Sequence, residues 1–139
     1  AQRRLDLVLK NTISEIGRAV EAFEVFAEGA QIPISAVRAL NLALDDLLNN
    51  VVSYAYEDEG EHEIRVHIEV GEGRVTVTIR DDGRPFNPFG SMDPDTSMPL
   101  DDREIGGLGI HLVEQMMDEV DYHRRINENV VRVVKYTGE

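Results

Sequence analysis

The chain of 139 residues contains neither cysteine nor tryptophan, and only 6% of its residues are aromatic. Without cysteine, it can form neither a disulfide scaffold nor a cysteine-ligated zinc site. No hydrophobic run approaches the roughly 18 residues that a membrane-spanning helix requires, and no secretory signal pattern opens the chain. We therefore expect a cytoplasmic protein that has no membrane partner.

Basic residues are also few, since 14 Lys and Arg stand against 27 Asp and Glu and the formal net charge is −13. Nonspecific binding to DNA and binding to anionic membranes both need clustered basic side chains. The composition therefore argues against direct nucleic-acid binding. The acidic charge serves solubility alone or suits a basic protein partner. With 42% hydrophobic residues in regular patterns, residues 1–139 are expected to form one globular domain.

Hydrophobic periodicity predicts the order of the secondary-structure elements. Alternating residues indicate strands near 4–10, 64–70, 75–79, 120–126 and 130–136, and helical spacing indicates helices near 12–28, 35–56 and 107–117. Short turns join neighbouring strands as hairpins. This order is typical of an α+β two-layer sandwich, in which helices cover one face of a mixed, mostly antiparallel sheet.

Residues 83–104 lack any periodicity and hold four of the five prolines of the chain. A loop of that length is uncommon in a compact domain and usually has a function. We therefore expect a functional loop between the third strand and the last helix.

Asp81 has the sharpest single position in the sequence. Counting back by twos from it reaches Ile79, Val77 and Val75, so its carboxylate has the parity of the core-facing side chains. An inward carboxylate is unfavourable unless donors meet it, and one such donor is a ligand amino group. Gly83 then lets the chain leave the sheet close to that ligand. The alternative is a simple turn, since Asp-Asp-Gly commonly ends a strand.

The helix near residues 35–56 carries Asp46 and Asn50 one turn apart, opposite its apolar line. The amide oxygen of Asn50 could bind Mg²⁺, which prefers oxygen ligands. Asp46 could orient or deprotonate an attacking hydroxyl group. The alternative is that both belong to the solvent face of an amphipathic helix.

Glycines cluster at the predicted start of the last helix, in Gly106-Gly107-Leu108-Gly109. Glycine weakens a helix, but it allows close backbone approach to a phosphate at the helix N-terminus. Arg103, just upstream, is a candidate contact for the γ-phosphate. The alternatives are glycines that serve as loop joints and a solvated loop arginine.

Other classes of site lack their motifs. No Walker A sequence is present, the four histidines show no metal-binding spacing such as H-E-x-x-H, and Ser91 and Ser97 lack a nucleophile-elbow context.

Three motifs together resemble the ATP-binding domain shared by histidine kinases, the Hsp90 chaperone, DNA gyrase and MutL, and most closely the bacterial anti-sigma factor serine/threonine kinases. The first is Asp46-Leu-Leu-Asn-Asn50 with its trailing Ala-Tyr, similar to the N-box. The second, Asp81-Asp-Gly-Arg-Pro-Phe-Asn-Pro88, is similar to the adenine-contacting box. The third, Gly106-Gly-Leu-Gly-Ile-His-Leu-Val113, is similar to the phosphate-lid box.

The resemblance implies an α/β sandwich that binds Mg-ATP under a flexible lid. By it, Asn50 holds Mg²⁺, Asp81 binds the adenine amine, and Asp46 is the general base. Residues 106–109 then lie at the phosphates. It also implies phosphorylation of a serine or threonine on a small antagonist protein, competing binding of a sigma factor, and a homodimer.

Two departures from the family pattern bear on activity. Asp46 stands where the family usually has glutamate, so the carboxylate falls about 1 Å short of the hydroxyl, enough to lower the rate on the order of a hundredfold. The segment Asn129-Val-Val-Arg-Val-Val134, at the last strand, lacks the Gly-Thr pair that many relatives have there. Two alternatives are a non-catalytic module in which ATP shapes an interaction surface, and the kinase domain of a larger phosphatase–kinase regulator.

Overall fold

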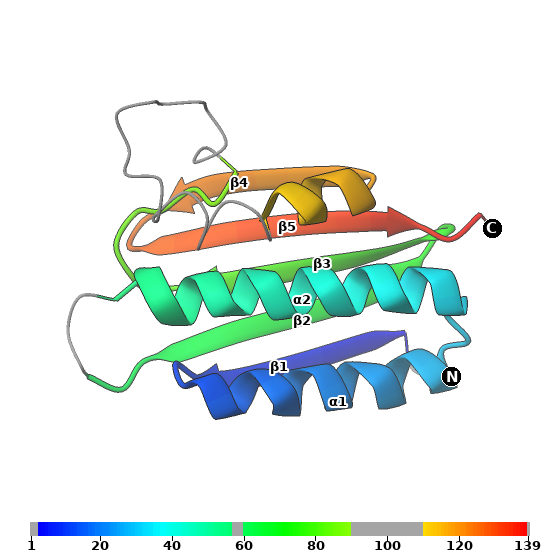
Figure 1. Ribbon diagram of the computed structural model, residues 1–139, viewed down its shortest axis with the longest axis horizontal. Helices are drawn as coiled ribbons and strands as arrows, with labels where there is room; N and C mark the ends of the chain where they lie inside the picture. Colours follow the sequence, from blue (N-terminus) through cyan, green and yellow to red (C-terminus); the bar gives the residue numbers. More distant parts are fainter. Residues whose placement is uncertain (1–2, 57–59, 90–109, 139) are drawn as a thin grey trace.

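The computed structural model describes residues 3–56, 60–89 and 110–138. Two long helices and five strands account for most of these residues, and residues 110–116 form a further short helix (Figure 1). The helices are α1 (Ile13–Gly29) and α2 (Ile34–Tyr54). The strands are β1 (Arg4–Lys10), β2 (Glu63–Gly71), β3 (Arg74–Asp81), β4 (Glu119–Arg125) and β5 (Glu128–Tyr136).

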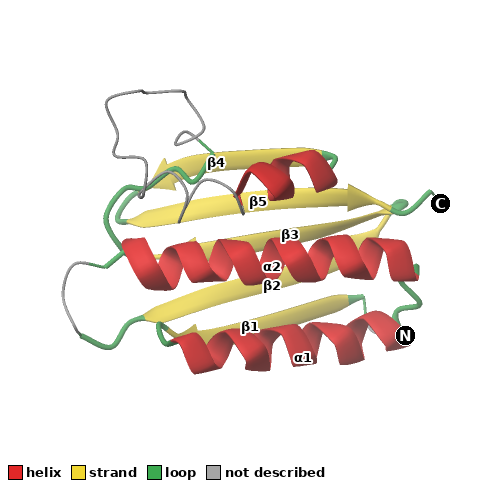
Figure 2. Ribbon diagram, in the orientation of Figure 1, coloured by secondary structure: helices red, strands yellow, loops and turns green. Residues whose placement is uncertain are grey.

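The strands form one sheet in the order β1-β2-β3-β5-β4 (Figure 2). All four neighbouring pairs are antiparallel, so the sheet expected as mostly antiparallel is antiparallel throughout. β5 lies inside β4, next to β3, although β4 comes first along the chain. The end of β3 and the start of β5 therefore lie side by side, and this contact builds the site described below.

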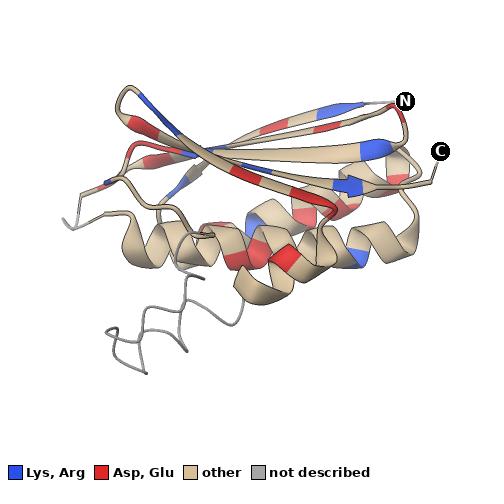
Figure 3. Ribbon diagram, turned by 90° about the horizontal axis from the view of Figure 1, so that it is seen from above, with Lys and Arg blue, Asp and Glu red and all other residues tan. Residues whose placement is uncertain are grey.

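The helices of the described residues all lie on one face of the sheet (Figure 3). Side chains alternate between the two faces along each strand, as in β3, where Val75, Val77 and Ile79 are buried. The α+β two-layer sandwich is thus confirmed. No helix among the described residues is long and apolar enough to cross a membrane.

α2 lies at the centre of the helical layer, between α1 and residues 110–116 (Figure 1). Because it has a helix on each side and the sheet beneath, more than one narrow face of α2 is buried. Its buried residues are Ala36, Ala39, Leu40, Ala43, Leu44, Leu47, Leu48, Asn50 and Val51.

The β2–β3 turn follows its predicted position at Gly71-Glu-Gly73. Glu72 and Gly73 have φ angles of 55° and 75°. A two-residue type I′ hairpin turn requires such positive values at both central positions. For the β4–β5 turn the sequence predicts residues 127–129, but β5 already begins at Glu128. That shift moves Asn129 from the turn into the strand.

α1 covers part of the free edge of β1. Arg18 donates from Nη2 to the carbonyl oxygen of Val8 at 3.0 Å, and the Lys10 N–H donates to Glu15 Oε1 at 3.0 Å. Arg18 and Glu15 also pair with each other at 2.9 Å. Since Arg18 and the Lys10 N–H both stabilise the carboxylate, they lower the pKa of Glu15 to about 2. Unpaired edge groups of a strand are thereby satisfied within the chain.

Gly83 joins the end of β3 to the end of α2. A Cβ atom at this position would lie 2.4 Å from the carbonyl oxygen of Ala55 and 2.7 Å from its Cβ. That carbonyl accepts a hydrogen bond from the Arg84 N–H at 2.8 Å, and Arg84 Nε donates to Tyr54 O at 2.8 Å. Only glycine permits this approach without a shift of the backbone.

We predict that Gly83→Ala destabilises the fold by on the order of 1–3 kcal/mol, because the added methyl group overpacks a backbone contact. Gly17→Ala is the matched control, since Gly17 lies in α1 and a Cβ atom there would meet no atom within 4 Å outside its own helix backbone. We expect Gly17→Ala to stabilise the fold by about 0.5–1 kcal/mol. Urea unfolding of both variants measures the difference, and equal stability of wild type and Gly83→Ala would contradict the steric argument.

Candidate functional site

Asp81 ends β3 on the face that the helices cover, and its side chain is only 4% exposed. The parity argument from the sequence is therefore confirmed. Its Oδ1 accepts hydrogen bonds from the Gly83 N–H at 3.0 Å and from Asn129 Nδ2 at 2.9 Å. Among the described residues Oδ2 accepts none, so one oxygen of a buried carboxylate is held and the other is available.

Asn129 is the residue that sequence reasoning placed wrongly. It is the cross-strand partner of Asp81 on β5 and is 1% exposed. Its Nδ2 donates to Asp81 Oδ1 and, at 2.8 Å, to Arg84 O. Its Oδ1 accepts from Tyr122 Oη at 2.6 Å and from the Phe86 N–H at 3.2 Å. The alternation of Asn129, Val131 and Val133 was the signal that could have placed it in the core-facing row.

Burial is the largest influence on the ionisation of Asp81, and it raises the pKa of the carboxyl above its ordinary value. The donors from Asn129 and Gly83 act against burial and lower that pKa. Asp82 raises it further and the Arg124 guanidinium lowers it. Arg124 is held close by, since its Nη1 donates to Gly83 O at 2.8 Å.

Asn50 lies on α2 and is 8% exposed. Its Nδ2 donates to Asp46 O at 2.9 Å, one turn earlier, so its Oδ1 is the polar atom that can face a ligand. The alternative in which Asn50 belongs to the solvent face of α2 is therefore wrong, and Ala43, two turns earlier on the same side of the helix, is also buried. The reason is the central position of α2, which places this side of the helix against neighbouring elements.

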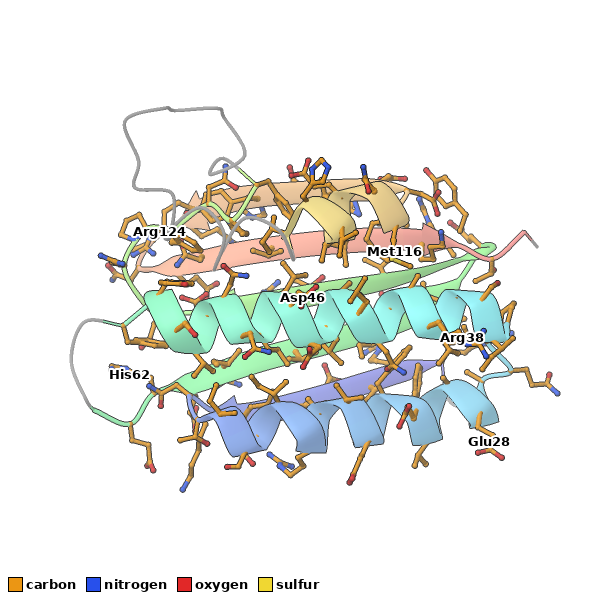
Figure 4. All side chains as sticks on the ribbon, in the orientation of Figure 1. Glu28, Arg38, Asp46, His62, Met116 and Arg124 are labelled. Carbon is orange, nitrogen blue, oxygen red and sulfur yellow. The ribbon has the colours of Figure 1, made fainter. Side chains whose placement is uncertain are left out.

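Asp46 is half-buried on the same side of α2 as Asn50. Figure 4 shows it on the edge of α2 that faces the helical residues 110–116. Burial raises the pKa of its carboxyl, and the adjacent Asp45 raises it further. A carboxylate with a raised pKa is a stronger base once ionised, which suits it to accept a proton.

Aromatic rings border the end of the sheet that carries Asp81. Tyr56 stacks on His62 with ring centroids 4.1 Å apart, and its hydroxyl donates to Asp82 Oδ1 at 3.2 Å. Tyr54 packs at an angle against Phe86, with ring centroids 6.1 Å apart. His62 and Arg124 both lie at this end of the molecule (Figure 4), opposite the end where the two termini lie (Figure 1).

The remaining predicted site residues are only partly covered by the structure. Gly83 is buried against Ala55, which gives it a structural role whether or not it contacts a ligand. Arg103, Gly106, Gly107, Leu108 and Gly109 lie outside the described residues. The structure thus places the end of β3, with Asp81, against the start of β5 and, through Gly83, against Ala55 at the end of α2.

The donor set suits a nucleotide with a hydrated magnesium ion better than a metal held by the protein alone. A buried acceptor oxygen on Asp81 fits a ligand N–H group, and an amide oxygen on Asn50 is a ligand type that Mg²⁺ accepts. Within the described ranges, no three His, Asp or Glu residues form a group that could hold a metal ion. Magnesium at this site would therefore take most of its ligands from water and phosphate oxygens.

A separate cleft of about 340 Å³ lies at the other end of the sheet, beneath the β2–β3 hairpin. None of the predicted site residues within the described ranges lines it. Its walls include Arg3, Gln31, Pro33, Arg74 and Thr137.

Comparison with known proteins identifies the family of the chain. The histidine kinase-like ATPase domain model matches residues 9–135. The serine/threonine-protein kinase BtrW of Bordetella bronchiseptica is 30% identical, covering 71% of this chain and 70% of BtrW. The serine-protein kinase RsbW of Bacillus velezensis is 32% identical, covering 74% of this chain and 67% of RsbW. RsbW of Listeria innocua is 28% identical over 97% of this chain and 87% of its own length.

Two solved structures share the fold at low sequence identity. The RsbU and RsbW domains of a Mycobacterium tuberculosis protein match with a TM-score of 0.71 and 14% identity over 97% of this chain. A blue-light activated histidine kinase of Erythrobacter litoralis matches with a TM-score of 0.57 and 21% identity over 77% of this chain. This chain spans about a third of each of those structures, 32% in both cases. The family match over residues 9–135 shows that the chain belongs to the histidine kinase-like ATPase domain family, and it is a distant relative of the RsbW and BtrW serine kinases.

Proposed function

We propose that the protein binds Mg-ATP and transfers its γ-phosphate to a serine or threonine of a partner protein. The observation that carries this proposal is the available Oδ2 of Asp81, a buried acceptor at the end of the sheet nearest the C-terminal end of α2. That oxygen accepts a hydrogen bond from the exocyclic amine of adenine. Asn50 and Asp46, which lie on successive turns of α2, are then proposed to lie alongside the nucleotide between its base and its phosphates.

Three residues of the chain have distinct roles in the proposed reaction. Asp81 orients the base, and Asn50 gives its amide oxygen to the metal. Asp46 accepts the proton of the substrate hydroxyl as that oxygen bonds to the γ-phosphorus and the bond to the ADP oxygen breaks. The magnesium ion, when bound, neutralises charge on the phosphates. Residues 103–109 are proposed to supply Arg103 and backbone N–H groups to the same phosphates.

The relatives suggest the partners. RsbW and BtrW are serine or serine/threonine protein kinases, and kinases of the anti-sigma type phosphorylate a small antagonist protein and bind a sigma factor. We propose the same two partners for this chain, in the cytoplasm and as a homodimer. We also propose that residues 1–139 act as one ATP-binding domain.

The aspartate at position 46 also favours a second candidate function. Its side chain is one methylene shorter than the family's usual glutamate, so binding of ATP without efficient transfer is a consistent alternative. The protein would then be an interaction module whose partner surface depends on the bound nucleotide. A kinase domain taken from a larger phosphatase–kinase regulator shares the site and differs only in what surrounds it.

We predict that ATP binds more tightly with Mg²⁺ than without it. Asn50→Ala should reduce this gain in ATP affinity from Mg²⁺ on the order of tenfold or more, because a metal ligand is lost. Asn49→Ala is the matched control, since Asn49 precedes Asn50 on α2 and its Nδ2 bonds Asp45 instead, at 2.9 Å. Isothermal titration calorimetry of the three proteins measures this effect. Absence of binding in the wild type would overturn the nucleotide site itself.

We also predict that Asp46→Ala lowers phosphate transfer by roughly 10²–10⁴-fold while ATP affinity changes little, because a general base acts in the transfer step. Asp46→Glu should raise the rate, since the longer side chain restores the reach. Asp45→Ala is the comparison, because it removes only the exposed neighbouring carboxylate and should lower the rate far less than Asp46→Ala does. The measurement is transfer from radiolabelled ATP to a candidate antagonist protein. Equal rates for Asp46→Ala and wild type would exclude Asp46 as the base.

A further inference from the structure

Asn129 has no hydrogen-bonding capacity left for a ligand. An asparagine side chain offers two N–H donors and an oxygen that accepts two bonds. Asp81 and Arg84 O take the donors, and Tyr122 and the Phe86 N–H fill the oxygen. A side chain that is buried and fully bonded within the protein acts on a neighbour rather than on the ligand itself.

The neighbour on which it acts is Asp81. Both hydrogen bonds to Asp81 end on Oδ1, one from Asn129 and one from the Gly83 N–H. Two donors on one oxygen define the rotation of the carboxylate plane, and so the direction in which Oδ2 points. The Gly83 N–H lies only two residues after Asp81 in the sequence. Of these two bonds, only the one from Asn129 therefore connects the Asp81 carboxylate to another strand.

Asn129 also connects Asp81 to the segment that follows it. Its bonds to Arg84 O and to the Phe86 N–H hold residues 84–86 beside the start of β5. Tyr122, from β4, holds the amide oxygen from the far side at 2.6 Å. The side chain of Asn129 thus links β5 by hydrogen bonds to β3, to β4 and to the first residues after Gly83.

We propose that Asn129 is a positioning residue for nucleobase recognition, which holds Asp81 Oδ1 so that Oδ2 faces the 6-amino group of adenine. The inference rests on the proposed nucleotide site and assigns its base selectivity to a residue on β5. An ionised Asp81 only accepts hydrogen bonds, so the arrangement selects a base that offers a donor at this position.

Ionisation of Asp81 depends on the same contact. Burial raises the pKa of Asp81, and the Asn129 donor is the strongest influence that lowers it. Among the residues that the structure describes, the other charged or titratable groups around the carboxyl are Asp82, Arg124 and Tyr56, with His62 stacked on Tyr56. Without Asn129, the pKa of Asp81 rises further. When the pH is lowered, ATP binding that requires ionised Asp81 is therefore lost at a higher pH in the variant than in the wild type.

The test compares ATP with purine riboside triphosphate, which lacks only the 6-amino group, by titration calorimetry on the whole chain. We expect the wild type to prefer ATP by roughly 10- to 100-fold, as for a hydrogen bond to a charged group. Asn129→Leu should reduce that preference to about threefold or less. It should also move the acidic limb of the ATP affinity profile to higher pH, a change that a purely structural role would not produce.

Tyr122→Phe is the matched control, because it removes one bond of Asn129 and leaves the bond to Asp81 intact. It should keep the preference for ATP. Asn129→Ala replaces the leucine variant if circular dichroism shows that the latter does not fold, since water can enter the smaller side chain's space and meet Arg84 O and the Phe86 N–H.

The possible outcomes separate the two proposals. A wild type that prefers ATP, with Asn129 variants that weaken both nucleotides equally and keep the pH profile, overturns the positioning role and leaves the nucleotide site in place. A wild type that binds neither nucleotide overturns the site, and the inference with it.

Discussion

A carboxylate beneath a layer of helices is stable only where hydrogen-bond donors meet it, and this requirement organises the end of the fold that carries the site. Asp81 obtains its donors from the turn that follows it and from the strand beside it. The second donor exists only because β5 inserts between β3 and β4 with Asn129 opposite Asp81. The order of the strands is therefore needed for the hydrogen bonding of Asp81 as well as for the packing of the sheet.

The helical layer imposes the complementary condition. α2 is buried on several sides, so Asn50 is buried and Asp46 half-buried, although other polar residues of the helix, such as Asp45, remain exposed. Asn50 is held there by its bond to the backbone of the preceding turn, and Asp46 lies one turn earlier with its ionisation altered by burial. The close contact of Gly83 with Ala55 joins this helix to the end of β3. The end of β3 in the sheet and the end of α2 in the helical layer are therefore held in a fixed position relative to each other.

Much of the fold follows from hydrophobic periodicity, because a one-sided sheet shows a clear alternation of apolar and polar residues. The same alternation is enough to locate Asp81 on the covered face. Burial of Asn50 does not follow, because it depends on the helices that flank α2 and not on the pattern within α2. The network of Asn129 is still less accessible, since its four partners come from segments up to 48 residues away in the sequence. A turn signal at residues 127–129 also concealed its place in the strand.

The bonds that Glu15 and Arg18 make with the edge of β1 have a consequence for assembly. The carbonyl of Val8 and the N–H of Lys10 are among the groups through which an incoming strand would extend the sheet, and both are already occupied by side chains of α1. At the opposite edge, β4 carries the charged side chains of Asp121, Arg124 and Arg125. Lateral growth of the sheet from one molecule into the next is thus disfavoured along both edges. Contacts with other molecules are then left to side chains on the faces of the fold.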